Sequence, residues 1–536
     1  MKKLKLVCVA IAMACTTPTL AGGLLTNTNQ HVAFDRMMSR EASIGIDGVY
    51  YNPAGVVFMS EGHHLAINWQ LAFQTRTINN DYALFTNNVN NPITPRDFKG
   101  TAFAPVIPSF QYAYNKGKWS FQASFALTGG GGKCTFDDGL GSFEKIVAET
   151  AIAACGLAGV VDKTLGNTLG QPGMEMFTSD QAFGKTGKYS FNSYMHGRQY
   201  YYGLSVGAAY KFCDNFSAFL GVRGVYALTN YYGYVENINV GNMPLYKVLD
   251  PTKESSANIE LSCDQSGVGF TPIIGVDYKT GRWNFSAKYE FKTRIRLKNK
   301  SVNQTPSIGN LPANLANQMT GILTAKYQQA GLPLEQAKQQ AENTTNAVLN
   351  DPTVGATMMG LKTQFDQKLN KAIGEYEDGK KIAGDIPAYL AIGVGYRPVD
   401  AVRVNVGFHW FDDKNATSYN NRNKELKRGT LEYNAGVEVD VNKKITLSTG
   451  WQNTNYGLSD EYMDDKSFVV SSNSVAIGGV YHINKKMDLN VAYFHTFYQH
   501  KKTTETVQLT ADISRNYSSD YTRNNNVFAV GLDINF

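Results

Sequence analysis

Residues 526–536, at the end of the chain, read Asn-Val-Phe-Ala-Val-Gly-Leu-Asp-Ile-Asn-Phe. From Phe528 to the terminal Phe536, every second residue is large and apolar, and the residues between them are small or polar. Successive side chains of a β-strand point to opposite faces, so an alternation with a period of two predicts a strand with one apolar face. The chain is therefore expected to end in a half-buried strand.

Similar strand candidates recur in pairs along the chain, joined by very short turns. The clearest, Trp283–Leu297, alternates apolar residues with seven polar ones. A polar face of this size requires either a wet lumen or internal partners, because burial of unpaired polar groups is costly. We predict fourteen strands, at residues 63–77, 109–115, 119–128, 200–212, 216–228, 267–279, 283–297, 388–397, 402–411, 431–441, 445–453, 475–483, 487–497 and 527–536.

The connections alternate between short turns and long excursions. Short periplasmic turns and long extracellular loops are typical of outer-membrane barrels, whose strands need about 9–11 residues to cross the bilayer. The predicted fold class is all-β, a 14-stranded antiparallel transmembrane β-barrel with helical extracellular loops. The predicted long loops are residues 78–106, 129–198, 229–265, 298–385, 413–428, 456–471 and 502–523. The predicted helices within them are residues 142–161, 315–330, 334–349 and 356–376.

The N-terminal sequence indicates that the protein is exported from the cytoplasm. Residues 1–21 combine a basic start, a short apolar run and the small-x-small sequence Thr19-Leu20-Ala21, which is typical of a signal peptide cleaved before Gly22. Acylation of Cys15 as a lipoprotein is the alternative. Residues 22–60 then precede the barrel, residues 61–536, and form either a plug (hatch) in its lumen or a flexible periplasmic tail.

Composition excludes some function classes. After the signal peptide no run of eighteen apolar residues is present. The mean hydropathy is -0.29, which suits a transmembrane barrel, because lumenal polar residues alternate with its apolar ones. The net charge of +6 is spread out, so no nucleic-acid partner is expected. The cysteines lack metal-ligand spacing, and we expect no cofactor. Cys134 and Cys155 are either paired with one another or unpaired thiols.

Several motifs together resemble FadL-type outer-membrane transporters of long-chain fatty acids and other hydrophobic compounds. The first is Asn52-Pro53-Ala54, which matches the family's NPA hatch motif immediately before the first predicted strand. The others are Gly269–Tyr278, Asp385-Ile386-Pro387, Gly395-Tyr396-Arg397-Pro398 and the terminal Phe536. The resemblance covers essentially the whole mature chain, although loops 129–198 and 298–385 match poorly.

The resemblance implies a monomeric protein in the outer membrane of a Gram-negative bacterium, in contact with outer-membrane lipid. It implies uptake of a hydrophobic small molecule, which is gathered by the loops, passes to a pocket at the hatch, and leaves beside a kinked third strand. Gly129–Gly132 follow that strand here and look terminal. The hatch residues would be Asn52, Pro53 and Ala54, and the ligand-binding residues Leu24, Leu25, Tyr231, Tyr232 and Lys414.

One departure concerns the substrate. The family's pocket takes an arginine from the outer extension of the fifth strand, whereas residues 229–234 here contain tyrosines and no basic residue. A channel for aromatic hydrocarbons or other neutral lipophiles is therefore the alternative to a fatty-acid transporter.

Other function classes fit less well. A general porin would lack the plug, and an adhesin would have its function in the loops. The sequence Gly203-Leu204-Ser205-Val206-Gly207 matches the GxSxG motif of hydrolases, but Ser205 lies in the middle of a predicted strand and not in a sharp strand-to-helix turn. His409 and His495 are read as strand residues, so we do not expect an enzyme such as an outer-membrane lipid hydrolase.

Overall fold

The computed structural model describes residues 24–306, 308–509 and 513–536, with only the backbone of 364–373. The expected signal peptide, residues 1–21, lies outside the described residues. The first and last strands, β1 (Gly62–Tyr82) and β18 (Ser514–Asn535), pair antiparallel from His64↔Asn535 to Tyr82↔Tyr517. This pairing closes the sheet into a barrel, so the wall has no free edge.

The described wall consists of fourteen antiparallel crossings built from seventeen of the eighteen strand segments. Three crossings are interrupted: β8 (Trp283–Glu290) with β9 (Arg296–Gln304), β10 (Lys381–Ala383) with β11 (Tyr389–Val399), and β16 (Met487–Tyr498) with β17 (Lys501–Gln508). A short extra segment, β6 (Met243–Pro244), lies in a loop. Besides β1 and β18, the uninterrupted crossings are β2 (Arg96–Lys116), β3 (Trp119–Phe136), β4 (Tyr189–Lys211), β5 (Phe216–Val240), β7 (Ile259–Thr280), β12 (Val402–Phe411), β13 (Thr430–Asn442), β14 (Ile445–Asn455) and β15 (Ser472–Asn484).

The two faces of the wall differ as the alternation predicts. Outward-facing Leu220 and Phe270 are 69% and 70% exposed, whereas inward-facing Asn68 and Gln70 are buried. An apolar outer band around a polar interior is the pattern of a barrel surrounded by lipid. The predicted fold class and the number of crossings are confirmed.

Several strands extend much further than predicted. β2 begins at Arg96, inside the predicted loop 78–106, and β17 with the start of β18 occupies much of the predicted loop 502–523. β17 is polar on both faces, with the sequence Lys-Lys-Thr-Thr-Glu-Thr-Val-Gln at Lys501–Gln508. The outer face has no lipid to cover beyond the bilayer, so the period-two signal disappears there although the hydrogen-bonded ladder continues.

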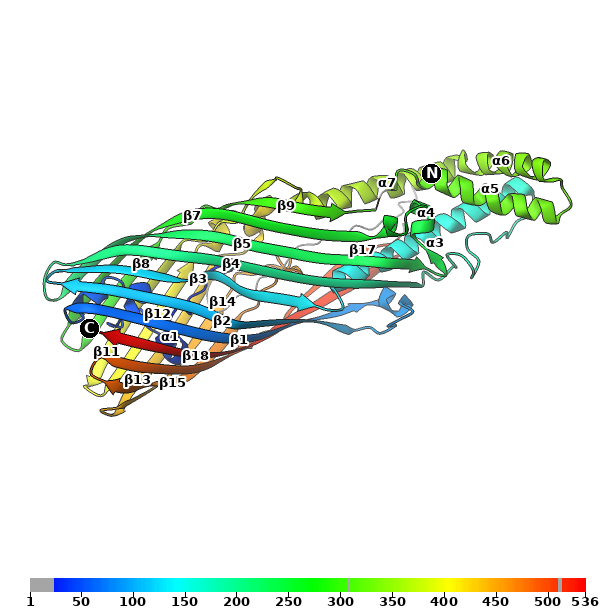
Figure 1. The fold of residues 1–536 in the computed structure, drawn as a ribbon. Helices are drawn as coiled ribbons and strands as arrows, with labels where there is room; N and C mark the ends of the chain where they lie inside the picture. The colour runs from blue at the N-terminus through cyan, green and yellow to red at the C-terminus, as the bar shows by residue number, and fades with distance from the viewer. Residues whose placement is uncertain (1–23, 307, 510–512) are drawn as a thin grey trace.

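The terminal residue joins the first strand. Phe536 and His63 exchange two backbone hydrogen bonds, at 2.8 and 2.9 Å, and their rings stack with centroids 5.5 Å apart. The end of the chain therefore lies at the edge of the barrel that carries the short turns (Figure 1).

The helices lie beyond the opposite edge and form a cap (Figure 1). They are α3 (Gly141–Leu169), α4 (Tyr246–Leu249), α5 (Leu311–Gln329), α6 (Leu334–Leu349) and α7 (Pro352–Ile373). The bounds of α6 are those predicted, and the other three predicted helices are present with longer or shifted bounds. No helix in the described ranges has the length and apolarity needed to cross a membrane.

Candidate functional site

Residues 24–60, which we call the plug segment, occupy the interior of the barrel. All residues from Thr26 to Ala42 are buried. The segment contains α1 (Val32–Met37), α2 (Gly48–Tyr51) and the 3-10 helix η1 (Gly55–Phe58), and α1 packs against strands from β13 to β1. Phe34 stacks on Tyr51 with ring centroids 5.3 Å apart. The lumen is therefore filled at this level.

Buried ion pairs attach the plug segment to the wall. Glu438 of β13 accepts hydrogen bonds from Arg36 and, at 3.0 Å, from Nη1 of Arg40. Nε of Arg40 also donates to Oδ2 of Asp47 at 2.7 Å. Burial alone would raise the pKa of Asp47, but the ion pair with Arg40 outweighs it and holds that pKa below its usual value. Because these groups are buried, loss of one partner would leave an uncompensated charge.

A histidine makes a second attachment. Nε2 of His409 on β12 lies 2.7 Å from Oε1 of Glu41, and its Nδ1 lies 2.8 Å from Oε2 of Glu432. All three side chains are buried. Contacts to carboxylates at both ring nitrogens favour the protonated imidazole, which donates at both.

The predicted hatch motif, Asn52-Pro53-Ala54, is bonded to the wall at each residue. Nδ2 of Asn52 donates to Oδ2 of Asp277 on β7 at 2.6 Å. The carbonyl oxygens of the next two residues accept from wall side chains, Pro53 from Nε2 of Gln122 at 2.7 Å and Ala54 from Oγ of Ser217 at 2.7 Å. The motif therefore anchors the end of the plug segment that leads into β1.

A cavity of about 820 Å³, the lumenal cavity, lies between the start of the plug segment and the cap. Leu24 and Leu25 line it, and Tyr231 of β5 lines its wall. The Leu24 N–H donates to Oδ1 of Asp413 at 3.2 Å, and the Thr430 N–H donates to Oδ2 of the same carboxylate at 2.9 Å. Burial raises the pKa of Asp413 to about 6.

The other two predicted ligand residues lie elsewhere. Tyr232 is on the opposite face of β5 from Tyr231, because neighbouring strand residues alternate, and it contacts Tyr194 and Tyr234 there. Lys414 follows Asp413 in η5 (Asp413–Asn415), but its Nζ donates to the carbonyl of Lys427 at 3.4 Å and does not line the lumenal cavity. The sequence-based prediction named Lys414 and did not include Asp413, the buried carboxylate that directly precedes it.

Carboxylates outnumber cations on the lumenal cavity. Its described lining has eight acidic side chains and three basic ones. Burial, together with repulsion from Asp464, raises the pKa of Asp465 above its usual value, whereas Lys466 and Arg422 outweigh burial and lower the pKa of Asp464. The acidic residues are Glu149, Glu375, Asp385, Asp413, Glu425, Asp464, Asp465 and Glu505, and the basic ones are Lys145, Arg422 and Lys466.

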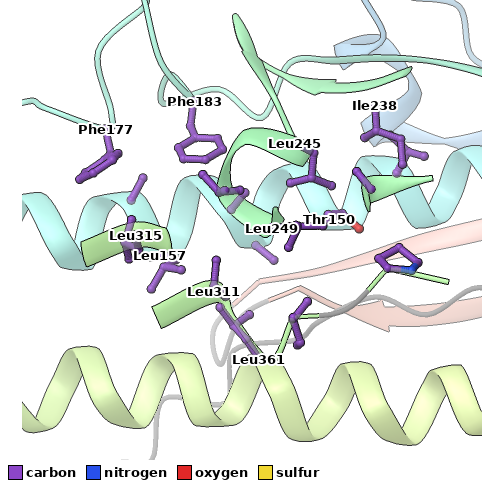
Figure 2. Close-up of a pocket in the computed structure, with 18 of the residues that line it drawn as sticks. Thr150, Leu157, Phe177, Phe183, Ile238, Leu245, Leu249, Leu311, Leu315 and Leu361 are labelled. Carbon is purple, nitrogen blue, oxygen red and sulfur yellow. The ribbon is translucent and has the colours of Figure 1, made fainter. Parts of the chain in front are cut away.

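The cap encloses a second cavity, the cap cavity, of about 130 Å³ (Figure 2). Figure 2 shows Leu157 of α3, Leu311 and Leu315 of α5, and Phe177 and Phe183 of the loop after α3 pointing into it. The helix faces thus pack on one another and leave an apolar space. Thr150 contributes a hydroxyl group, which donates to the carbonyl of Ile146 at 2.8 Å. Ile146 lines both cavities.

The wall is interrupted between β2 and β3. These strands pair at residues 100–103 with 133–136 and at 110–116 with 119–125, and no pairing is recorded between the two stretches. We call this gap the wall break. The sequence predicted that Gly129–Gly132 follow the third strand, but they lie within β3. The pairing with β4 shifts register twice beside them. Glycines permit such bulges.

The plug segment lies against the wall break. The Asn27 N–H donates to the Thr128 carbonyl at 2.9 Å, and Asn27 Nδ2 donates to the Gly130 carbonyl at 2.7 Å. A Cβ atom on Gly129 would lie 2.3 Å from the carbonyl oxygen of Leu25. Backbone groups that the wall leaves unpaired are thus satisfied by the plug segment.

The remaining motifs show no reactive arrangement. Ser205 lies within β4, and its Oγ accepts a hydrogen bond from Nε of Arg223 at 3.0 Å. The strand continues through the GxSxG match without the turn that a nucleophile requires. Cys155 Sγ contacts the carbonyl of Phe183 at 3.4 Å, and no disulfide joins the cysteines that the structure describes. Within the same residues, no cluster of three His, Cys, Asp or Glu could hold a metal ion.

The fold and site together define a plugged transmembrane β-barrel. The chain is similar in structure to a FadL homologue of Pseudomonas aeruginosa, with a TM-score of 0.58 and 13% identity over 96% of this chain and 100% of that chain. It is also similar to the deltaS2S3 mutant of TodX, a monoaromatic hydrocarbon channel, with a TM-score of 0.50 and 13% identity over 94% and 99% of the two chains. The predicted FadL-type resemblance is confirmed at the level of the fold. A scan of protein-family models and a comparison with curated protein sequences found no match.

Proposed function

We propose that this chain takes up hydrophobic small molecules, such as long-chain fatty acids, passively across the outer membrane of a Gram-negative bacterium. The observation that carries the proposal is a series of three features: an apolar cavity in the cap, a larger lumenal cavity below it, and a wall break closed by the plug segment. In this proposal residues 1–21 are a signal peptide, residues 22–60 the hatch and residues 61–536 the barrel, which acts as a monomer among outer-membrane lipids.

The cap cavity would be the entry site. Dry apolar cavities of about 150 Å³ bind benzene-sized ligands, so a space of about 130 Å³ suits one aromatic ring or part of an alkyl chain. Its one hydroxyl group is engaged by a helix carbonyl. Ile146 lines both cavities, so they lie next to one another, and a ligand would have a short distance to cross.

The plug segment would be the gate. Leu24 and Leu25 offer apolar contacts to a ligand in the lumenal cavity, and Tyr231 of the wall is part of the same lining. Movement of residues 24–30 would break the bonds from Asn27 to β3 and open the wall break sideways toward the membrane. Asn52, Pro53 and Ala54 would hold the other end of the segment in place.

The alternative ligand class is a neutral lipophile, such as an aromatic hydrocarbon. The excess of carboxylates on the lumenal cavity favours it, because these groups repel an ionised fatty acid and leave a neutral molecule unaffected. A plug segment that fills the lumen opposes a general porin.

Uptake measurements test the proposal. Cells that express the wild-type chain, Leu24→Asp, or a deletion of residues 22–50 are given a labelled fatty acid or a labelled alkylbenzene. We expect Leu24→Asp to lower uptake several-fold, and the deletion to alter the uptake of both compounds. Leu334→Asp, an exposed position on α6, is the matched control. Unchanged uptake in both variants, with folded barrels, would contradict the hatch mechanism, and the more efficiently taken-up compound identifies the ligand class.

A further inference from the structure

Two arginines lie side by side in the interior of the barrel. Arg76 of β1 and Arg523 of β18 are direct cross-strand partners, and their exposed fractions are 0% and 5%. Nε of Arg76 and Nη2 of Arg523 donate to the same acceptor, Oε1 of Gln74, at 3.1 and 2.7 Å. Like charges placed directly opposite one another destabilise a sheet, so this pair needs a physical explanation.

No described carboxylate compensates Arg76. Neither its Nη1 nor its Nη2 has a hydrogen-bond partner among the described residues, and it forms no ion pair there. The titratable groups around it are Arg523, Cys134, Tyr456 and Tyr498, and none of these is a carboxylate. The side-chain amide of Asn525, two residues after Arg523, likewise has no described partner at either atom. A buried guanidinium in such surroundings is costly unless an anion accompanies it.

The pair lies between the lumenal cavity and the wall break. Tyr521, which lines the cavity, precedes Arg523 by two residues on the same face of β18. The Phe468 ring packs against Tyr521 with centroids 5.1 Å apart and lies over the Arg76 guanidinium at 5.8 Å. On the other side, Arg76 pairs with Gly100 of β2, and the wall break begins after Phe103.

We propose that Arg76 and Arg523 form an anion-binding site that receives the carboxylate of an amphipathic ligand on its way from the lumenal cavity to the wall break. A guanidinium binds a carboxylate through two parallel N–H···O bonds, and Nη1 and Nη2 of Arg76 are available for this geometry. The lumenal cavity is rich in acidic groups, whereas Arg76 offers a positive charge with no carboxylate among the described groups around it. The site itself would bind only the carboxylate of the ligand. That the ligand also has a hydrophobic tail rests on the proposed function, the uptake of hydrophobic molecules.

Direct binding to the purified full chain in detergent tests the site. Affinities are measured for a saturated long-chain carboxylic acid, for the primary alcohol of the same chain length, and for inorganic phosphate. We expect the acid to bind the wild-type protein about tenfold to a hundredfold more tightly than the alcohol, the range for hydrogen bonds to a charged group. Arg76→Gln should remove most of this preference and leave the affinity for the alcohol unchanged. Arg198→Gln, an exposed arginine on β4, is the matched control.

The outcomes separate the two proposals. Equal affinity of the wild type for acid and alcohol would overturn the anion site and leave hydrophobic uptake standing. Tight binding of phosphate without a preference for the acid would overturn it as well, in favour of a small inorganic anion. Absence of binding of both lipophiles by a folded barrel would contradict the proposed function itself. The comparison of acid and alcohol needs no variant, so it decides the question even if Arg76→Gln does not fold, and Arg76→Lys then tests the need for the guanidinium fork.

Discussion

The backbone N–H of Leu24 donates a hydrogen bond to the buried carboxylate of Asp413, at 3.2 Å, and so ties the start of the plug segment to the loop after β12. The same carboxylate accepts from the Thr430 N–H at the start of β13. One side chain thus connects the start of the plug segment to the wall at the lumenal cavity.

Asp413→Asn should remove a pH dependence of stability. The folded-state pKa of Asp413, about 6, lies above its ordinary value of 3.8 because burial favours the neutral acid. The folded protein then binds the proton more tightly than the unfolded chain, so the free energy of unfolding falls as the pH rises from about 4 to 6, by up to about 3 kcal/mol. Urea unfolding of wild type and variant across this range measures the difference. Asp214→Asn, a fully exposed position, should keep the wild-type slope.

Gly129→Ala should displace the plug segment from the wall break. The new Cβ atom would lie 2.3 Å from the Leu25 carbonyl oxygen, so either β3 or the plug segment must shift, at a cost of roughly 1–3 kcal/mol. We expect faster hydrogen exchange at Asn27, whose amide is bonded to β3. Gly224→Ala on β5, where the nearest atom is 3.7 Å away, is the control. Identical exchange at Asn27 in both variants would show that the gate does not depend on this contact.

Glu438→Gln should loosen the plug segment without opening the barrel. Arg36 and Arg40 would lose their shared buried carboxylate, and removal of one partner from a buried ion pair costs about 3–5 kcal/mol. Limited proteolysis should then cleave within residues 32–47 while the strands of the barrel remain intact. Glu505→Gln, whose side chain is 59% exposed, should leave the cleavage pattern unchanged. Resistance of both variants to cleavage would argue that packing alone holds the segment.

Ala153→Phe should block the cap cavity. Ala153 is buried and lines this cavity, so a phenyl ring placed there would occupy the space proposed for the ligand. Uptake of a labelled alkylbenzene should fall several-fold, with little change in barrel stability. Ala330→Phe, at the exposed end of α5, provides the comparison. Normal uptake by Ala153→Phe would mean that ligands reach the lumenal cavity by another route.

The strands and helices show where a local sequence pattern is sufficient to predict the bounds of an element. Val402–Phe411 and α6 (Leu334–Leu349) have the bounds that the sequence predicts, because lipid or helix packing imposes a strict apolar period on them. Lys501–Gln508 was predicted as loop, since neither face of that extension meets lipid. Trp283–Leu297 was predicted as one strand, but its ladder is interrupted at residues 291–295, where backbone bonds go to Pro272 and Ile386 instead.

The residues of the candidate site show where local sequence patterns are not sufficient to predict which side chains meet. Leu24, Leu25 and Tyr231 line the lumenal cavity, whereas the neighbour Tyr232 faces outward and Lys414 lies outside it. Asp413 was not identified, because a single aspartate at a strand end has no signal of its own. Its importance comes from burial and from the N–H of a residue almost four hundred positions earlier in the chain.

By itself the sequence determined the kind of barrel and its fourteen crossings, since the alternation of apolar and polar residues is local and lipid enforces it on every strand. The tertiary structure alone decided which interior groups meet. Arg76 and Arg523 become neighbours only when β1 pairs with β18, and Asn27 reaches Gly130 only when the plug segment enters the lumen. Such contacts depend on closure and register, which are set by the sum of many pairings and not by any one stretch of residues.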